Sequence, residues 1–103
     1  MAGIKMKATS KGPYTEVKAI LSHPMETGRR INQQTGKVYP AHYIKEVTAE
    51  VNGRLVFSAD WGPAIAKNPF LGFRFKGGNK GDPFKISWID TKGASDSKEV
   101  KIR

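Results

Sequence analysis

Residues 71–88 read LGFRFKGGNKGDPFKISW, two short alternations of apolar and polar residues joined by a glycine-rich segment. The apolar positions are Leu71, Phe73, Phe75, Phe84, Ile86 and Trp88. A repeat of two residues is typical of a β-strand that buries one face. We therefore predict a strand on each side of the glycine-rich segment.

The same alternation recurs in five other segments, whereas the 3.6-residue spacing of an amphipathic helix is nearly absent. These segments lie at residues 4–8, 17–21, 43–49, 55–59 and 100–102. Lys5 and Lys7 in the first segment are typical of a protected sheet edge. About seven short strands predict an all-β fold, an immunoglobulin-like antiparallel β-sandwich, formed as a single domain over residues 1–103. It has no disulfide, because the chain contains no cysteine.

Charge and hydropathy narrow the possible classes of protein. Lys and Arg total 18 and Asp and Glu total 9, so the formal net charge is +9. No apolar run approaches the roughly 20 residues that a membrane-spanning helix needs. The first ten residues interrupt their apolar positions with lysine and lack the apolar stretch of about 7–15 residues found in a signal peptide. We expect a chain that does not bind membranes and carries no secretory signal.

Asn52-Gly53 marks a hairpin whose register depends on the length of its loop. A two-residue loop places Glu50 opposite Leu55 and mixes polar and apolar side chains on each face of the sheet. A three-residue loop over residues 51–53, with Gly53 left-handed, places Val47 opposite Phe57 and Glu50 opposite Arg54. Because one face must be uniformly apolar, we predict the three-residue loop.

Residues 22–41 do not alternate, and prolines and glycines interrupt them. A loop of this length in a small domain is typically functional, and a mobile surface connection is the alternative. Apolar residues also occur at strand positions expected to face water, namely Ile20, Ile44, Phe70 and Ile89. We predict that Ile44 and Ile89 lie on neighbouring strands and form one outer apolar patch, which would mark an interface.

Motifs for catalysis or metal binding are not recognisable. His23 and His42 are the only imidazoles, and neither a nucleophile elbow nor a metal-ligand spacing accompanies them. Residues 77–82 lack the Gly-Lys-Ser/Thr ending of a phosphate-binding loop, and we predict a hairpin there instead. We therefore expect no catalytic residue, no metal and no cofactor, with a small hydrolase that uses His23 or His42 as a distant alternative.

The positive charge suggests an anionic partner, but it is spread along the chain, and no basic run is longer than Arg29-Arg30. An acidic protein partner and small anions fit it equally well. A basic β-domain that binds nucleic acid or another polyanion is therefore the alternative function, and binding that collapses between low and moderate salt would favour it.

Three segments together resemble the SoxZ family of bacterial sulfur oxidation proteins. They are AILSHPMETG at residues 19–28, PAHYIKEV at residues 40–47 and WGPAIAKNPFLGFRFKGG at residues 61–78. The resemblance extends from about residue 17 to the C-terminus. It implies a small all-β protein, in agreement with the strand pattern.

The resemblance implies a non-catalytic subunit of the SoxYZ sulfur carrier complex. The partner, SoxY, has a C-terminal arm whose single cysteine carries covalent sulfur intermediates during thiosulfate oxidation. The pair forms a heterodimer or a larger assembly and docks transiently to the Sox enzymes, without nucleic acid or membrane. A periplasmic location is implied, reached by co-export with a partner that supplies the signal.

Partner-binding residues are expected in or directly after the three segments and on the outer sheet faces. They are His23, Met25, Glu26, Arg29, Ile44, Trp61, Asn68, Phe70 and Ile89. For each of them a purely structural role is the alternative; Trp61 and Phe70, for example, could be core residues at a sheet corner.

Overall fold

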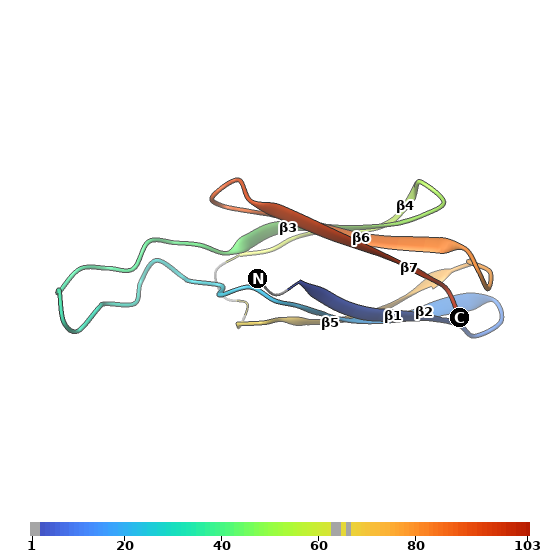
Figure 1. Ribbon diagram of the computed structural model, residues 1–103, viewed down its shortest axis with the longest axis horizontal. Coiled ribbons are helices and arrows are strands. Elements are labelled where there is room, and N and C mark those ends of the chain that lie inside the picture. The colour runs from blue at the N-terminus through green and yellow to red at the C-terminus, as the bar shows by residue number, and fades with distance from the viewer. Residues whose placement is uncertain (1–2, 63–64, 66) are drawn as a thin grey trace.

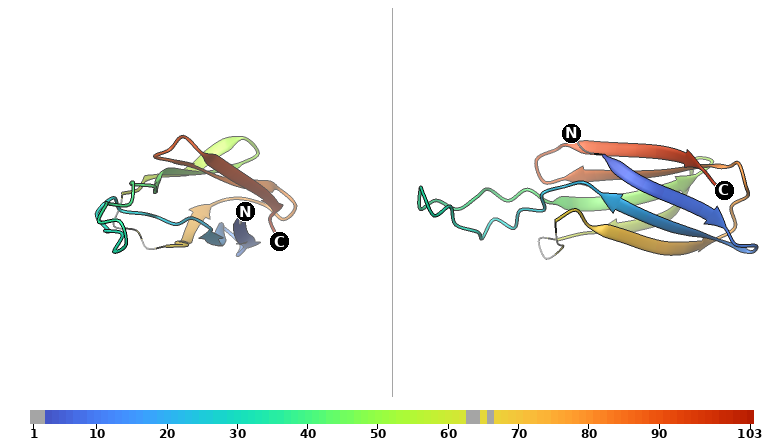
Figure 2. Two further views of the ribbon diagram at one scale, coloured as in Figure 1. Left: turned by 60° about the vertical axis from the view of Figure 1, so that its left-hand side comes forward. Right: turned by 60° about the horizontal axis from the view of Figure 1, so that its bottom comes forward.

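The computed structural model describes residues 3–62, 65 and 67–103 (Figure 1). In these residues the strands are β1 (Ile4–Ser10), β2 (Tyr14–Leu21), β3 (Ile44–Val51), β4 (Arg54–Asp60), β5 (Phe70–Lys76), β6 (Pro83–Asp90) and β7 (Ser95–Lys101). They form two antiparallel sheets, with the strand orders β1-β2-β5 and β4-β3-β6-β7, stacked face to face (Figure 2). The predicted all-β sandwich and its seven strands are confirmed. The third predicted motif includes residues 63, 64 and 66, which lie outside the described residues.

The core lies between the two sheets and is built from the alternating apolar positions. Phe84, Ile86 and Trp88 of β6 are all buried. Phe84 stacks on Phe75 of the opposite sheet, with ring centroids 5.7 Å apart. Removing a side chain of this size from water contributes roughly 1.5–3 kcal/mol. Aromatic rings thus fill the space that a disulfide spans in antibody domains.

The glycine-rich segment 77–82 crosses from one sheet to the other. Because β5 and β6 belong to different sheets, the prediction of a hairpin here is wrong. The crossing needs a close approach: a Cβ atom on Gly78, whose φ is +82°, would lie 2.5 Å from Thr15 Oγ1. The Thr15 hydroxyl donates a hydrogen bond to the Gly77 carbonyl at 2.7 Å. Glycine therefore lets the chain pass directly over β2.

The Asn52-Gly53 hairpin has a two-residue loop, so the predicted three-residue loop is wrong. Val51 pairs with Arg54 and Glu50 with Leu55, and both loop residues have positive φ. A β-bulge then shifts the register, so that Ala49 pairs with Phe57 and Val47 with Ala59. The bulge keeps Val47, Ala49, Phe57 and Ala59 on one face, while Leu55 lies exposed opposite Glu50 on the other face. Gly53 is left-handed, as predicted, with φ +78°.

A second bulge, at Lys45, reverses the expected side of Ile44. Glu46 pairs with Ile89, but Ile44 pairs with Asp90, so one residue of β3 is left over. Ile44 consequently faces the core and is 0% exposed, whereas Ile89 is 40% exposed. The predicted outer patch of Ile44 and Ile89 is therefore wrong, although β3 and β6 are neighbours as expected.

One lateral side of the sandwich is closed by β1 and the C-terminal residues. β1 contacts β7 of the other sheet. Beyond β7, the Arg103 amide donates to the Ala8 carbonyl at 3.0 Å, and the Ser10 amide donates to the Arg103 carbonyl at 2.8 Å. β1 is an edge strand of its sheet, as its lysines predicted. The described part of the chain contains no helix long and apolar enough to span a membrane.

Candidate functional site

Three polar side chains from distant parts of the sequence meet where the long loop leaves the sandwich. Asp90, at the end of β6, is only 1% exposed. Its Oδ2 atom lies 2.9 Å from His23 Nε2 and 2.7 Å from His42 Nε2. Its Oδ1 atom accepts hydrogen bonds from the backbone amides of Lys92 and Ala94, both at 2.9 Å. We call His23, His42 and Asp90 the root cluster.

The hydrogen bonds of His23 fix the position of its ring proton. His23 Nδ1 accepts the Met25 amide at 3.0 Å, so His23 carries its proton on Nε2 and donates it to Asp90. The ligand atoms of the cluster lie within 4.8 Å of one another, a spacing that a metal ion could bridge. A metal on Nε2 would move the proton to Nδ1, where it would face the Met25 N–H. The arrangement therefore fits a hydrogen-bonded structural cluster better than a metal site.

The pKa of Asp90 reflects two opposing influences. Burial raises it, but the hydrogen bonds from His23 and His42 and from the backbone amides of Lys92 and Ala94 lower it from 3.8 to about 2. The charged carboxylate is therefore the form that stabilises the folded chain. All four of these bonds would weaken if Asp90 were protonated.

Acid is expected to destabilise the domain through Asp90. Because the folded pKa is lower than the unfolded one, the contribution of Asp90 is complete above about pH 4 and is lost as the pH falls through about 2. A decrease from 3.8 to about 2 corresponds to about 2 kcal/mol. Urea titrations of the wild type and of Asp90→Asn at pH 5 and pH 2 measure this. The stability advantage of the wild type should shrink by that amount, and an advantage independent of pH would contradict the assignment.

Asn68 and Met25 hold the chain around His23. The His23 amide donates to Asn68 Oδ1 and the Asn68 amide donates to the His23 carbonyl, both at 3.0 Å. Met25 is buried, and its sulfur accepts the Ile44 amide at 3.3 Å. Both Met25 and Asn68 have positive φ, which is uncommon for residues with a side chain and here is stabilised by these contacts.

Residues 26–42, the last of which is His42 of the root cluster, form a long arm that projects from one end of the sandwich (Figure 1). Its two limbs are bridged at Glu26–His42 and at Ile31–Val38. Glu26 also forms a bidentate salt bridge with Arg30, at 2.9 and 2.8 Å. Ile31 and Val38 are exposed apolar residues far from the core. The arm thus presents apolar side chains to solvent on a rigidly anchored base.

The side of the sandwich opposite β1 and β7 carries several half-buried apolar residues on or directly after β4 and β5. β4 and β5 are the edge strands there, one in each sheet. Phe57 of β4 stacks on Phe73 of β5 with ring centroids 4.4 Å apart, yet both rings are only half-buried. The other half-buried apolar residues of the seam are Val56, Ala59, Trp61 and Leu71. We call these six residues the apolar seam.

The predicted partner-binding residues are spread over five places in the fold. Four of them, His23, Met25, Ile44 and Asn68, come together around the root cluster, and all but Asn68 are buried. Glu26 and Arg29 lie on the arm, and Trp61 lies in the apolar seam. Phe70 and Ile89 lie on the outer faces of different sheets. The residues therefore do not form one contiguous surface.

Sequence reasoning missed Asp90 as the centre of the root cluster and His42 as its second imidazole. One local signal was present: Asp90 directly precedes the turn Thr91-Lys92-Gly93, and aspartate commonly accepts backbone amides at such a position. Ile31 and Val38 of the arm also gave no signal, because they stand alone among polar residues.

Comparison with known proteins agrees with the sequence motifs. No curated protein matches this sequence at a significant level. The family model described as sulphur oxidation protein SoxZ matches residues 4–101, nearly the whole chain. The match covers all seven strands, the root cluster and the arm. The chain therefore belongs to the SoxZ family of sulfur oxidation proteins.

Proposed function

We propose that this chain is the non-catalytic subunit of a SoxYZ sulfur carrier complex and that it binds a SoxY-like partner permanently along the apolar seam. The observation that carries the proposal is that the stacked rings of Phe57 and Phe73 remain partly exposed between β4 and β5, which are edge strands in the part of the chain that the structure describes. Permanent interfaces resemble a domain core cut in half and are more apolar than transient ones. A partner surface against the seam would complete the burial of these rings.

The chemistry of the chain supports a role without bond making. It has no cysteine, so a sulfur intermediate bound through a thiol must be carried by the partner. In the root cluster, both oxygens of Asp90 accept hydrogen bonds and His23 uses both ring nitrogens. These groups hold the arm and leave no free general base at Asp90 or His23.

The carrier function also implies a docking role and a cellular location for the pair. The enzymes that load, cleave and oxidise the partner's sulfur cargo would dock to it in turn, so this chain would supply a fixed surface while the cysteine arm moves. We place the complex in the periplasm, reached together with the partner. Support for both comes from the SoxZ family membership.

Co-purification tests the permanent interface. We expect the wild type to retain a SoxY-like partner at both 20 mM and 500 mM salt, because an apolar interface is little affected by ionic strength. Val56→Lys should weaken the complex at least about tenfold, since it introduces a charge into the seam. The measurement is the dissociation constant by calorimetry, with thermal melting of the free chain to confirm folding.

Leu55→Lys is the matched control for Val56→Lys. Leu55 is the preceding residue of the same strand, but it is exposed and pairs with Glu50 outside the seam. Its variant should bind the partner like the wild type. If both variants bind normally, the partner does not use the seam; if the wild type fails to bind it at all, or if the purified chain alone oxidises thiosulfate, the carrier function is wrong.

A further inference from the structure

The outer face of the β1-β2-β5 sheet is strongly basic. Its outward positions include five cationic residues, Lys5, Lys7, Lys18, Arg74 and Lys76, and one acidic residue, Glu16. Arg103 lies beside them at the end of β1. We call these seven residues the basic face. More than half of the net charge of the chain is therefore gathered on one side.

The outer face of the other sheet has the opposite character. Its outward positions carry the acidic residues Glu46, Glu50, Asp60 and Glu99, with Lys85 and Lys101 as bases and with Lys45 exposed at the bulge next to Glu46. Ser58, Ser87, Ser95 and Ser97 occupy most of the remaining positions. The uneven distribution makes the molecule an electric dipole across its thickness, and such a field orients an approaching charged protein.

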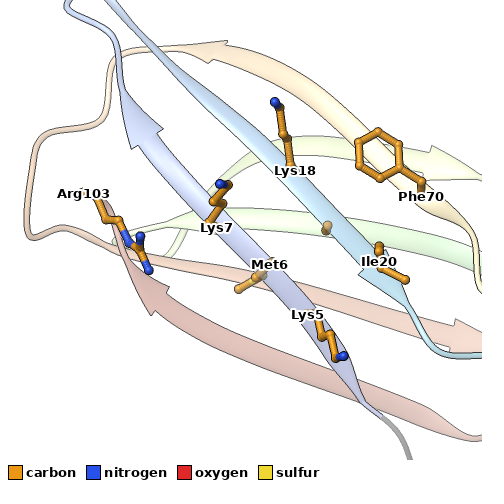
Figure 3. Close-up of a pocket in the computed structure, with 8 residues that line it drawn as sticks. Lys5, Met6, Lys7, Lys18, Ile20, Phe70 and Arg103 are labelled. Carbon is orange, nitrogen blue, oxygen red and sulfur yellow. The ribbon is translucent and has the colours of Figure 1, made fainter.

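An apolar pair lies at one end of the basic face. Ile20 and Phe70 are direct cross-strand neighbours and are 45% and 65% exposed. They border a shallow groove of about 400 Å³ that Lys5, Lys7, Lys18 and Arg103 also line (Figure 3). The Phe70 ring lies over Gly72, where a Cβ atom would come within 3.1 Å of it. Glycine at this position therefore lets the ring lie along the sheet and leaves the groove open.

We propose that the basic face docks an acidic surface of another protein, with one apolar side chain of that protein entering the groove beside Ile20 and Phe70. A small apolar spot surrounded by charge is typical of a transient interface, in contrast to the apolar seam. Long-range attraction would bring the partner in, and the apolar contact would fix its position. We identify the docking protein as an enzyme that acts on the carrier, and this identification rests on the proposed function.

Two features favour a protein over a nucleic acid as the occupant. Nucleic-acid platforms present several aromatic rings on which successive bases stack. On the basic face, Tyr14 is already covered by the Arg74 guanidinium, 5.0 Å from its ring centroid, which leaves Phe70 as the open ring among the outward positions. Ile20 beside Phe70 offers an aliphatic surface that suits an inserted apolar side chain.

Binding kinetics test the proposal. The carrier complex, and separately this chain alone, are passed over each immobilised enzyme that acts on the carrier, at 20 and 200 mM salt. For at least one enzyme the association rate should fall tenfold or more between these salts, and Lys7→Glu with Lys18→Glu should lower it similarly at 20 mM. Phe70→Ala should mainly speed dissociation. The SoxY-like partner should co-purify with the wild type, with the Lys7→Glu/Lys18→Glu variant and with Phe70→Ala.

Lys85→Glu with Ile89→Ala is the matched control, because it changes one charge and one exposed apolar residue on the opposite face. It should bind like the wild type. Unchanged kinetics in the basic-face variants, or an equal loss in the control, would overturn the proposal. Three other results would also overturn it. The basic-face variants could lose the SoxY-like partner, which would make the face part of the permanent interface. The wild type could bind a 20-nucleotide oligo-dT or associate with itself, and the basic-face variants could abolish that binding. Failure of the wild type to bind SoxY would refute the proposed function instead. The measurements made with this chain alone would still test whether the basic face docks an acidic protein.

Discussion

Asp90→Ala is expected to lower the free energy of unfolding by about 3–5 kcal/mol. The substitution removes the common acceptor of four hydrogen bonds. His23 would keep a buried Nε2–H without an acceptor, and a buried unsatisfied donor costs about 1–3 kcal/mol. His42 is less affected, because its side chain is 28% exposed and can turn to water. Since small domains are stable by only about 5–15 kcal/mol, melting should occur far below the wild-type temperature.

Asp82→Ala is the matched control for Asp90→Ala. Asp82 also lies in a turn, and its carboxylate accepts a backbone amide, that of Asn79, at 2.9 Å. It has no histidine partner, so its loss should cost only about 0.5–1.5 kcal/mol, as for one ordinary hydrogen bond. Urea titration at pH 7 compares the variants. An equal loss of stability in both would mean that the root cluster contributes little beyond its turn.

The strands could be predicted from the sequence because alternation is a local signal. Phe84, Ile86 and Trp88 show their burial by spacing alone, and the structure confirms it. The sheet to which a strand belongs is not a local property. Residues 77–82 have the composition of a hairpin turn, yet the Gly78 approach to Thr15 takes the chain to the other sheet. Only the contacts of β5 and β6 with other strands decide between these two courses.

The root cluster could not be predicted from the sequence. His23 and His42 lie 67 and 48 residues before Asp90 in the sequence, and no motif with such spacings predicts that they meet. Each histidine alone is uninformative, and Asp90 alone indicates only a turn. The cluster exists because β2 and β6, in opposite sheets, end at the same end of the sandwich and because the arm brings His42 back to that place.

Both errors of register have the same physical cause. A β-bulge inserts one residue and turns every later side chain to the other face, and it has little sequence signature. At Val56 a bulge allowed the short Asn52-Gly53 loop together with an apolar core face. At Lys45 a bulge turned Ile44 inward. Where a bulge occurs, alternation predicts the strand correctly and assigns its faces wrongly.

The three surfaces of the domain differ in chemistry and hence in the partners that they suit. The apolar seam consists of apolar side chains and suits the permanent partner proposed above. The basic face combines a long-range electrostatic field with a small apolar contact. It therefore suits a partner that associates and dissociates quickly. The arm is anchored through Asp90 to the strand β6, which contributes to the core between the two sheets. The proposed carrier function needs this separation, because an enzyme that docks transiently must not displace the permanent partner.

Ile44→Asp is expected to unfold the domain. Ile44 is 0% exposed, so the change loses about 1.5–3 kcal/mol of apolar burial and also places a carboxylate in the apolar core. The total loss should be about 5 kcal/mol or more, comparable to the whole stability of a small domain. Circular dichroism and a proton NMR spectrum of the purified variant measure this.

Ile89→Asp separates burial from chemistry, because it makes the same change one strand away. Ile89 is 40% exposed, and the new carboxylate would remain in water, opposed only by mild repulsion from Glu46. Its cost should stay within about 1 kcal/mol, and the folded spectrum should persist. Alternation alone places both isoleucines on a wet surface and predicts two folded variants. A folded Ile44→Asp would therefore mean that the bulge at Lys45 is absent and that Ile44 lies outside the core.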